Sequence, residues 1–131
     1  MNIARVIVRV LGSALIILGV LFWTGNALTL IPVHMLLGIL LVLSLWTIAI
    51  LAVRSGEHPG FVAIALGWGL IVPVLGLTQD QLLPGGLHWL IKIVHLLVGL
   101  GAIGLAEVLV RRGMARTADR QFPMTQPAHG G

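Results

Sequence analysis

Four ionisable side chains stand out within the apolar stretches of this sequence: His34, His88, Lys92 and His95. Imidazole nitrogens bind metal ions, and a lysine ammonium group binds anions, so these residue types could hold a metal-containing cofactor. Polar side chains inside a bilayer are costly, which makes each of them a candidate for a functional site. His88, Lys92 and His95 follow one another at i, i+4 and i+7, and this spacing puts all three on one face of a helix.

A small residue follows two of these histidines by one helical turn. Gly38 comes four residues after His34, and Gly99 comes four residues after His95. Small side chains beside the imidazoles would leave room for the flat face of a cofactor. We therefore include Gly38 and Gly99 in the candidate cofactor-binding set.

The composition identifies the kind of protein that must position these side chains. Of the 131 residues, 58% are apolar and 9% are charged, and cysteine is absent. A soluble domain usually carries about 25% charged residues. The composition thus excludes an ordinary soluble domain, and it also excludes a disordered chain, which would need low hydrophobicity and high charge. Without cysteine, the chain cannot form a disulfide framework or a thiolate metal site.

The net charge of +4 does not indicate a nucleic-acid partner. Nucleic-acid-binding proteins carry basic residues along one face, interleaved with aromatic residues for stacking, and no such stripe is present. The arginines instead flank the apolar runs, which is where membrane proteins keep their cytoplasmic positive charges. They are Arg5, Arg9, Arg54, Arg111, Arg112, Arg116 and Arg120.

The apolar runs predict an all-α integral membrane protein. The stretch between Arg9 and Arg54 has no charged residue and is too long for one crossing of about 20 residues. Thr24-Gly25-Asn26, followed by Pro32, divides it into two helices. We expect an up-down-up-down four-helix bundle. The expected helices are 4–24, 32–53, 61–78 and 87–111, within a transmembrane domain over 1–112 that precedes a disordered cytoplasmic tail over 113–131.

The arginines also predict the orientation in the membrane. Both ends of the chain and the 54–60 loop carry positive charge, whereas the loops 24–31 and 79–86 carry none. The positive-inside rule then places both termini in the cytoplasm, for a multi-pass protein of a bacterial cytoplasmic (inner) membrane. Counting about 20 residues back from Arg54 and Arg111 places the three histidines in the outer half of the bilayer.

Haem b is the cofactor that best fits these histidines. A helix bundle with imidazoles on facing helices can hold a haem iron from both sides. We expect His34 and His95 as axial ligands, His88 as the alternative ligand, and Lys92 as a partner of a haem propionate. A mononuclear zinc or copper site fits less well, because His88 and His95 are about 10.5 Å apart along a helix whereas metal–nitrogen bonds are about 2 Å.

The four-helix layout carries two motifs, His34 in Val-His-Met-Leu-Leu-Gly and the segment His88-Trp-Leu-Ile-Lys-Ile-Val-His95. In this combination the chain resembles the small membrane-bound b-type cytochromes, and it is similar to one half of the haem A synthases. The resemblance implies a haem held between facing histidines and a role in electron transfer. The depth of the histidines places this site near the outer, periplasmic face. Those families place their histidines in clearer pairs, whereas this chain has three. Either His88 or His95 could partner His34, or His88 could instead cap an outer site. An electron-transfer or accessory subunit is favoured over a stand-alone enzyme.

Other interpretations remain open at this stage. Glycines on several helix faces suit a cofactor-free accessory subunit that packs against other membrane subunits, or a homodimer. The histidines could simply lie at the membrane interface, and Lys92 could extend its stem towards water. A small transporter using Lys92 and His95 is a third function. Residues 79–81 could line a pocket for a quinone, and Glu107 is expected to pair with Arg111 at i, i+4.

Overall fold

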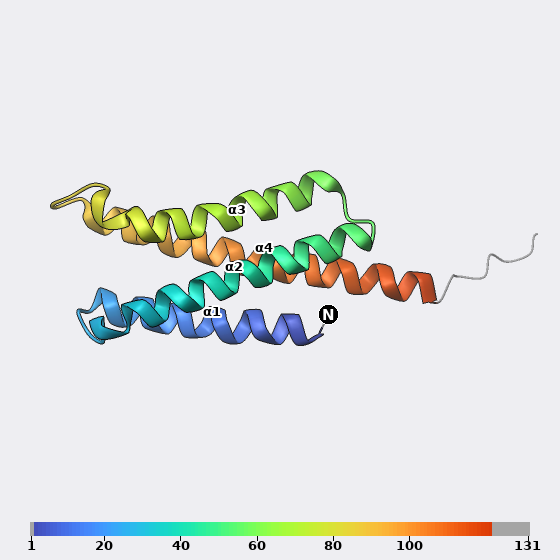
Figure 1. Ribbon diagram of the computed structural model, residues 1–131, viewed down its shortest axis with the longest axis horizontal. Coiled ribbons are helices and arrows are strands. Elements are labelled where there is room, and N and C mark those ends of the chain that lie inside the picture. The colour runs from blue at the N-terminus through green and yellow to red at the C-terminus, as the bar shows by residue number, and fades with distance from the viewer. Residues whose placement is uncertain (1, 122–131) are drawn as a thin grey trace, which may run out of the picture.

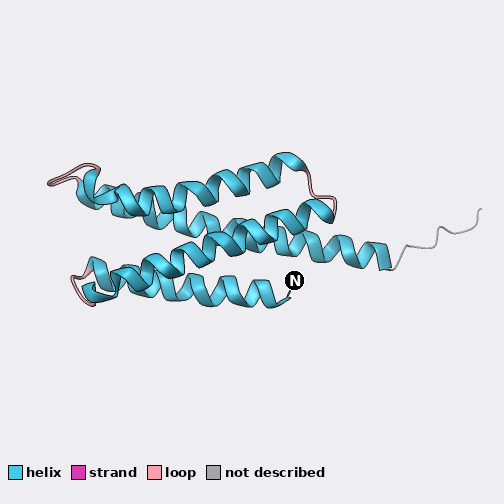
Figure 2. Cartoon of the chain, viewed as in Figure 1, coloured by secondary structure: helices cyan, strands magenta, loops and turns pink. Residues whose placement is uncertain are grey.

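The protein is an all-α four-helix bundle. The computed structural model describes residues 2–121, and among these it contains no strand. Figures 1 and 2 show four long helices joined by short connections. The long helices are α1 (Asn2–Trp23), α2 (Ile31–Arg54), α3 (Pro59–Thr78) and α4 (His88–Gln121), and the short 3-10 helices are η1 (Leu28–Leu30) and η2 (Gln79–Gln81).

The helix boundaries follow from local sequence signals. Proline occupies the first turn of both α2 and α3, where its missing N–H costs no hydrogen bond. His58 caps α3, because its Nδ1 accepts a hydrogen bond from the backbone N–H of Gly60 at 3.1 Å. Gly25 and Gly56 follow the ends of α1 and α2 with positive φ angles of 77° and 83°, a backbone region that glycine enters without steric cost.

The four helices are long and apolar enough to cross a membrane, by their length and composition. Their outer faces carry large hydrophobic side chains that are exposed on the isolated chain, such as Ile17 at 60%, Leu36 at 57% and Leu97 at 58%. Exposed apolar surface of this extent is stable only against lipid or another apolar partner. The chain is thus a multi-pass membrane protein.

The last helix is longer than the sequence predicted. We expected it to end at 111 and to be followed by a disordered tail from 113, but α4 continues as a helix to Gln121. Gly113 is buried, and Met114 packs against the hydrophobic core, so this part of α4 is held by tertiary contacts. The prediction of disorder was wrong for 113–121, and its remainder, 122–131, lies outside the described residues. Figure 1 shows α4 extending past the other helices at the end where the chain begins.

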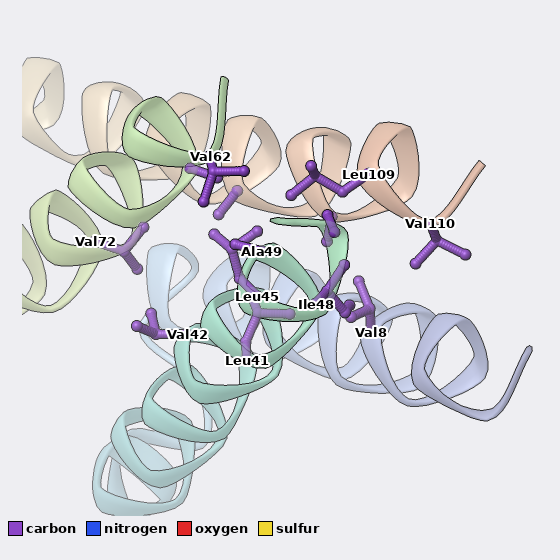
Figure 3. Packing of buried hydrophobic residues seen from close by; sticks show 14 residues of the cluster. Val8, Leu41, Val42, Leu45, Ile48, Ala49, Val62, Val72, Leu109 and Val110 are labelled. Atoms are coloured by element: carbon purple, nitrogen blue, oxygen red, sulfur yellow. The ribbon is translucent and has the colours of Figure 1, made fainter. Parts of the chain in front are cut away.

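The helices α2 and α4 lie diagonally across the bundle from each other and are in contact through its centre. They contact each other and both remaining helices, whereas α1 and α3 do not contact each other within the described chain. Leu45, Ile48 and Ala49 of α2 are at most 2% exposed, and Ala102 and Ala106 of α4 are equally buried. Figure 3 shows Leu45, Ile48 and Ala49 on the inner face of α2. Because alanine is small, α2 and α4 can approach closely along this diagonal.

Two tryptophans connect consecutive helices through hydrogen bonds to backbone carbonyls. Trp46 Nε1 of α2 donates to the Leu66 carbonyl of α3 at 3.1 Å, and Trp68 Nε1 of α3 donates to the Val98 carbonyl of α4 at 2.9 Å. In both cases the indole ring lies over a glycine three residues after the accepting carbonyl, where a Cβ atom would collide with the ring. These glycines are Gly69 and Gly101.

Candidate functional site

The bundle brings His34 and His95 together. His34 lies in the first turn of α2, and His95 lies two turns into α4. Because these two helices form the diagonal of the bundle, the imidazole rings face each other with centroids 6.3 Å apart and planes tilted by 51°. The sequence left open whether His88 or His95 partners His34, and it is His95 that lies beside it.

Both imidazoles have a nitrogen without an internal partner. Each side chain is partly buried, and the Nδ1 atoms of His34 and His95 are buried without a hydrogen bond among residues 2–121. A buried polar atom that makes no hydrogen bond costs roughly 1–3 kcal/mol, and native structures contain few of them. These two unpartnered atoms on neighbouring rings make the His34–His95 pair the candidate site, since neither nitrogen makes a hydrogen bond within the described chain.

The walls around this histidine pair come from all four helices. The Phe22 ring of α1 packs edge-on against His34, with centroids 5.4 Å apart. On the α3 side, a Cβ atom on Gly76 would lie 3.3 Å from Cε1 of His95. By contrast, Gly38 and Gly99 have no heavy atom within 4 Å of the position that a Cβ atom would occupy. The two glycines that sequence analysis assigned to the site thus adjoin open space.

His88 contacts the connection between α3 and α4. Its Nδ1 lies 3.4 Å from the carbonyl oxygen of Leu82, and its Nε2 lies 3.9 Å from a carboxylate oxygen of Asp80. The Asp80 side chain is 91% exposed, so this pair lies at the solvent-facing end of the bundle. These contacts give His88 a role in holding the loop against the start of α4.

Lys92 and the loop 79–81 have few contacts that bear on their predicted roles. Lys92 is partly buried on the same helix as His95, and within the described residues it makes no hydrogen bond or ion pair. Residues 79–81 form η2, which contacts α3 and α4. Nothing in these contacts assigns a quinone to the loop, so that expectation remains a prediction.

The number of available ligands separates the possible metal centres. Among residues 2–121, no group of three or more histidine, aspartate or glutamate side chains could hold a metal ion. Zinc sites use three or four protein ligands, whereas a haem iron needs only axial ligands from the protein. Two imidazoles bound at about 2 Å on opposite sides of one metal ion have ring centroids roughly 6 Å apart. The 6.3 Å between the centroids of His34 and His95 is close to that separation.

At the opposite end of the bundle, the carboxylate of Glu107 has partners that the sequence did not predict. Glu107 of α4 accepts a hydrogen bond from Arg5 Nε at 3.0 Å, and Arg9 of α1 donates to it through Nε and Nη2. The expected partner Arg111 is farther away, with Nε at 3.8 Å. Arg5 and Arg9 are spaced i, i+4 on α1, and α1 and α4 carry their arginines at the same end of the bundle. This spacing could have pointed to the cluster in the sequence.

Glu57 forms a second ionic cluster at the same end. Its side chain is 1% exposed and accepts hydrogen bonds from Arg116 at 2.7 Å and Arg112 at 3.3 Å. Burial alone would raise the pKa of Glu57, but the hydrogen bonds from Arg116, the backbone N–H of His58 and Arg112 outweigh it, so the pKa lies below its ordinary value. Arg112 also stacks over the Phe61 ring at 4.6 Å. This cluster ties the α2–α3 connection to the extension of α4.

Comparison of the chain with protein-family models, curated proteins and solved structures gave no match.

Proposed function

We propose that this protein is a haem-b-binding electron-transfer protein of a bacterial inner membrane, in which His34 and His95 would hold the haem iron. The observation that carries the proposal is the facing pair of imidazoles, 6.3 Å between centroids, whose buried Nδ1 atoms lack a partner within the described chain. Haem, when bound, supplies reversible one-electron chemistry at its iron. The protein's own contribution is to orient the two imidazoles and to exclude water from them.

The neighbouring residues support the same assignment. The open positions beside Gly38 and Gly99 provide room next to the ligands, and the Phe22 ring restricts the orientation of His34. Lys92 is the cation assigned to a haem propionate, because it is partly buried and carries no internal ion pair among residues 2–121. The Nδ1 of His88 contacts the loop carbonyl of Leu82 instead of His34, and we therefore assign His88 no role as a ligand.

The site is expected to exchange electrons on the side of the membrane opposite the two termini. His34 lies in the first turn of α2, and both the α1–α2 and α3–α4 connections lie at this end of the bundle (Figure 1). With the arginine-bearing termini in the cytoplasm, this end faces the periplasm. A donor or acceptor would thus reach the site through the periplasmic connections.

The visible spectrum of detergent-purified protein tests this proposal. We expect a Soret band, and sharp α and β bands on reduction, as six-coordinate haem gives. His34→Ala and His95→Ala should each abolish most of the Soret absorbance. His88→Ala and His58→Ala are matched controls, since each removes one imidazole that contacts only its own loop or helix start, and both should keep the band.

Two results would contradict the proposal. A colourless protein that also fails to take up added haem would show that the protein does not bind this cofactor. A Soret band unchanged in the His34→Ala/His95→Ala double variant would mean that other residues hold the iron.

A cofactor-free accessory subunit is the second candidate function. It is favoured by exposed glycines on the outer helix faces, Gly67 of α3 and Gly104 of α4, which have no heavy atom within 4 Å of a Cβ position. Small residues on lipid-facing helices let another helix approach closely. This function predicts comigration with a larger membrane complex, lost in Gly67→Leu or Gly104→Leu and kept in His34→Ala.

A further inference from the structure

The carboxylate of Glu107 is surrounded by more positive charge than it can neutralise. Arg5 and Arg9 of α1 and Arg111 of α4 all lie within 4.0 Å of its oxygens. One carboxylate compensates one guanidinium, so the cluster carries a surplus of positive charge at the junction of α1 and α4. Charge of this kind at a membrane surface requires an anionic partner or water.

Most hydrogen-bond donors of these arginines are unused. A guanidinium has five N–H donors. Within the described residues, Arg5 donates only through Nε, Arg9 donates through Nε and Nη2, and Arg111 makes an ion pair without a hydrogen bond. Their side chains are 28%, 55% and 68% exposed, respectively, so the free donors are accessible. Glu107 fixes the position of the guanidinium groups and leaves their remaining donors free.

The Glu57 cluster differs in this respect. Arg116 donates through both Nη atoms to a carboxylate that is only 1% exposed, and Arg112 donates to the same carboxylate while stacking over Phe61. In that cluster two guanidinium groups share one buried carboxylate, and the Arg112 and Arg116 side chains are 51% and 35% exposed. The Glu107 cluster is the more open of the two, because three guanidinium groups surround one carboxylate and two of them are more than half exposed.

Apolar side chains on α1 are interleaved with the arginines of the open cluster. Ile3, Val6 and Val10 are 77%, 59% and 63% exposed, and they alternate along the helix with Arg5 and Arg9. A ligand that met both surfaces would need an anionic group for the arginines and hydrocarbon for these side chains. Phospholipids with a net negative headgroup have this chemistry, and basic pockets between transmembrane helices bind such headgroups.

We propose that the junction of α1 and α4 is a binding site for an anionic phospholipid, with Arg5, Arg9 and Arg111 donating hydrogen bonds to its phosphodiester oxygens. Bidentate contacts from arginine suit the planar arrangement of phosphate oxygens. This site is independent of the haem proposal, because it lies on the opposite end of the bundle and shares no residue with it.

Binding of defined lipids to the delipidated, detergent-purified full-length protein tests this site, with native mass spectrometry as the readout. We expect phosphatidylglycerol to bind more tightly than phosphatidylcholine. The Arg5→Gln/Arg111→Gln variant should lose about fivefold in phosphatidylglycerol affinity for each arginine replaced, from the attraction of one cation to an anionic lipid surface. Arg54→Gln is the matched control, since it removes one exposed arginine at the end of α2 and should keep the preference.

Three outcomes would overturn the proposal. They are equal binding of the two lipids by the wild type, an equal loss in Arg54→Gln, and competition by inorganic phosphate at the lipid's own concentration, which would indicate a site for the free anion. If the double variant does not fold, Arg111→Gln alone decides the question. Its guanidinium makes no internal hydrogen bond among residues 2–121, and its loss should still weaken phosphatidylglycerol binding about fivefold.

Discussion

The two ends of this bundle differ in whether their buried or partly buried polar groups have hydrogen-bond partners within the chain. At the end that carries the arginines, the carboxylates of Glu57 and Glu107 are each met by two or more guanidinium groups. At the other end, the buried Nδ1 atoms of His34 and His95 have no hydrogen-bond partner within the described chain. The carboxylates at one end are therefore satisfied by residues of the chain, and the two imidazole nitrogens at the other end are not.

Under the haem proposal, this difference separates residues that stabilise the fold from residues that would bind a ligand. Breaking one partner of a buried ion pair leaves an uncompensated charge and destabilises a protein strongly. Replacing an unpaired buried polar group by an apolar group of similar shape is nearly neutral or stabilising. Substitutions at the two ends should thus change stability in opposite directions, and four measurements test that comparison.

The largest effect is expected for Glu57→Ala. Loss of this carboxylate leaves Arg112 and Arg116 facing each other without a counter-charge, and because both can partly turn to water we expect a loss of about 3 kcal/mol in the free energy of unfolding. Unfolding in mixed micelles with increasing SDS measures it. Asp80→Ala is the control, since this carboxylate is 91% exposed and its loss should change stability by less than about 0.5 kcal/mol. Equal effects of the two substitutions would remove the contrast between the ends.

The pH dependence of stability gives a smaller part of the same effect. The pKa of Glu57 in the folded protein is lowered from its ordinary value of 4.5, so ionisation of this group favours folding. Its contribution is complete above pH 4.5 and is lost as the pH falls through the folded-state pKa. We expect the Tm of the wild type to fall more steeply below pH 4.5 than that of Glu57→Gln. Parallel Tm curves for the two proteins would mean that this carboxylate contributes nothing by ionisation.

An opposite sign is expected at the histidine end. In haem-free protein, His95→Leu should raise the free energy of unfolding by about 1 kcal/mol, because it removes a buried nitrogen that has no partner. His58→Leu is the counterpart, since His58 caps α3 and its loss should lower stability by about 1 kcal/mol. The SDS titration described above applies to both. Destabilisation by His95→Leu would indicate that the imidazole is already satisfied without a ligand.

The smallest expected change comes from Gly38→Ala. No atom lies within 4 Å of the new Cβ, and alanine is a better helix former than glycine, so haem-free protein should gain about 0.5 kcal/mol. Haem content per protein, measured from the Soret absorbance, should fall because the methyl group occupies the open space beside His34. Gly69→Ala provides the control, as its Cβ would collide with Trp46 and should destabilise the protein. Unchanged haem content in Gly38→Ala would indicate that the cofactor does not lie beside this glycine.

The sequence predicted the architecture well because the bilayer imposes a simple pattern. The charge-free run before Arg54, the turn residues after Trp23 and the prolines at helix starts are local signals, and they predicted the boundaries of the first three helices to within a few residues. The end of α4 was missed because its last turns are polar and look like a tail. They are helical through contacts with the core and with Glu57, which no local pattern reports.

The candidate site was predictable in its residue types but not in its pairing. Periodicity placed His88, Lys92 and His95 on one helix face, and this does not decide which imidazole reaches His34. Which histidine pairs with His34 depends on the contact between α2 and α4, and on the contact of His88 with the α3–α4 connection. The contacts of Arg5 and Arg9 with Glu107 span 102 and 98 residues of sequence, so an i, i+4 rule found only the weaker partner Arg111.

The tryptophan hydrogen bonds have a consequence for the order in which the chain assembles during synthesis. The indole of α2 needs only the carbonyl of α3, and the indole of α3 needs only the carbonyl of α4, so each junction can form as soon as the next helix enters the membrane. Helix α1 is made first, but the carboxylate that binds its arginines belongs to α4. Of these four helices, the earliest to be made is therefore the one whose arginines find their carboxylate only when α4 is made.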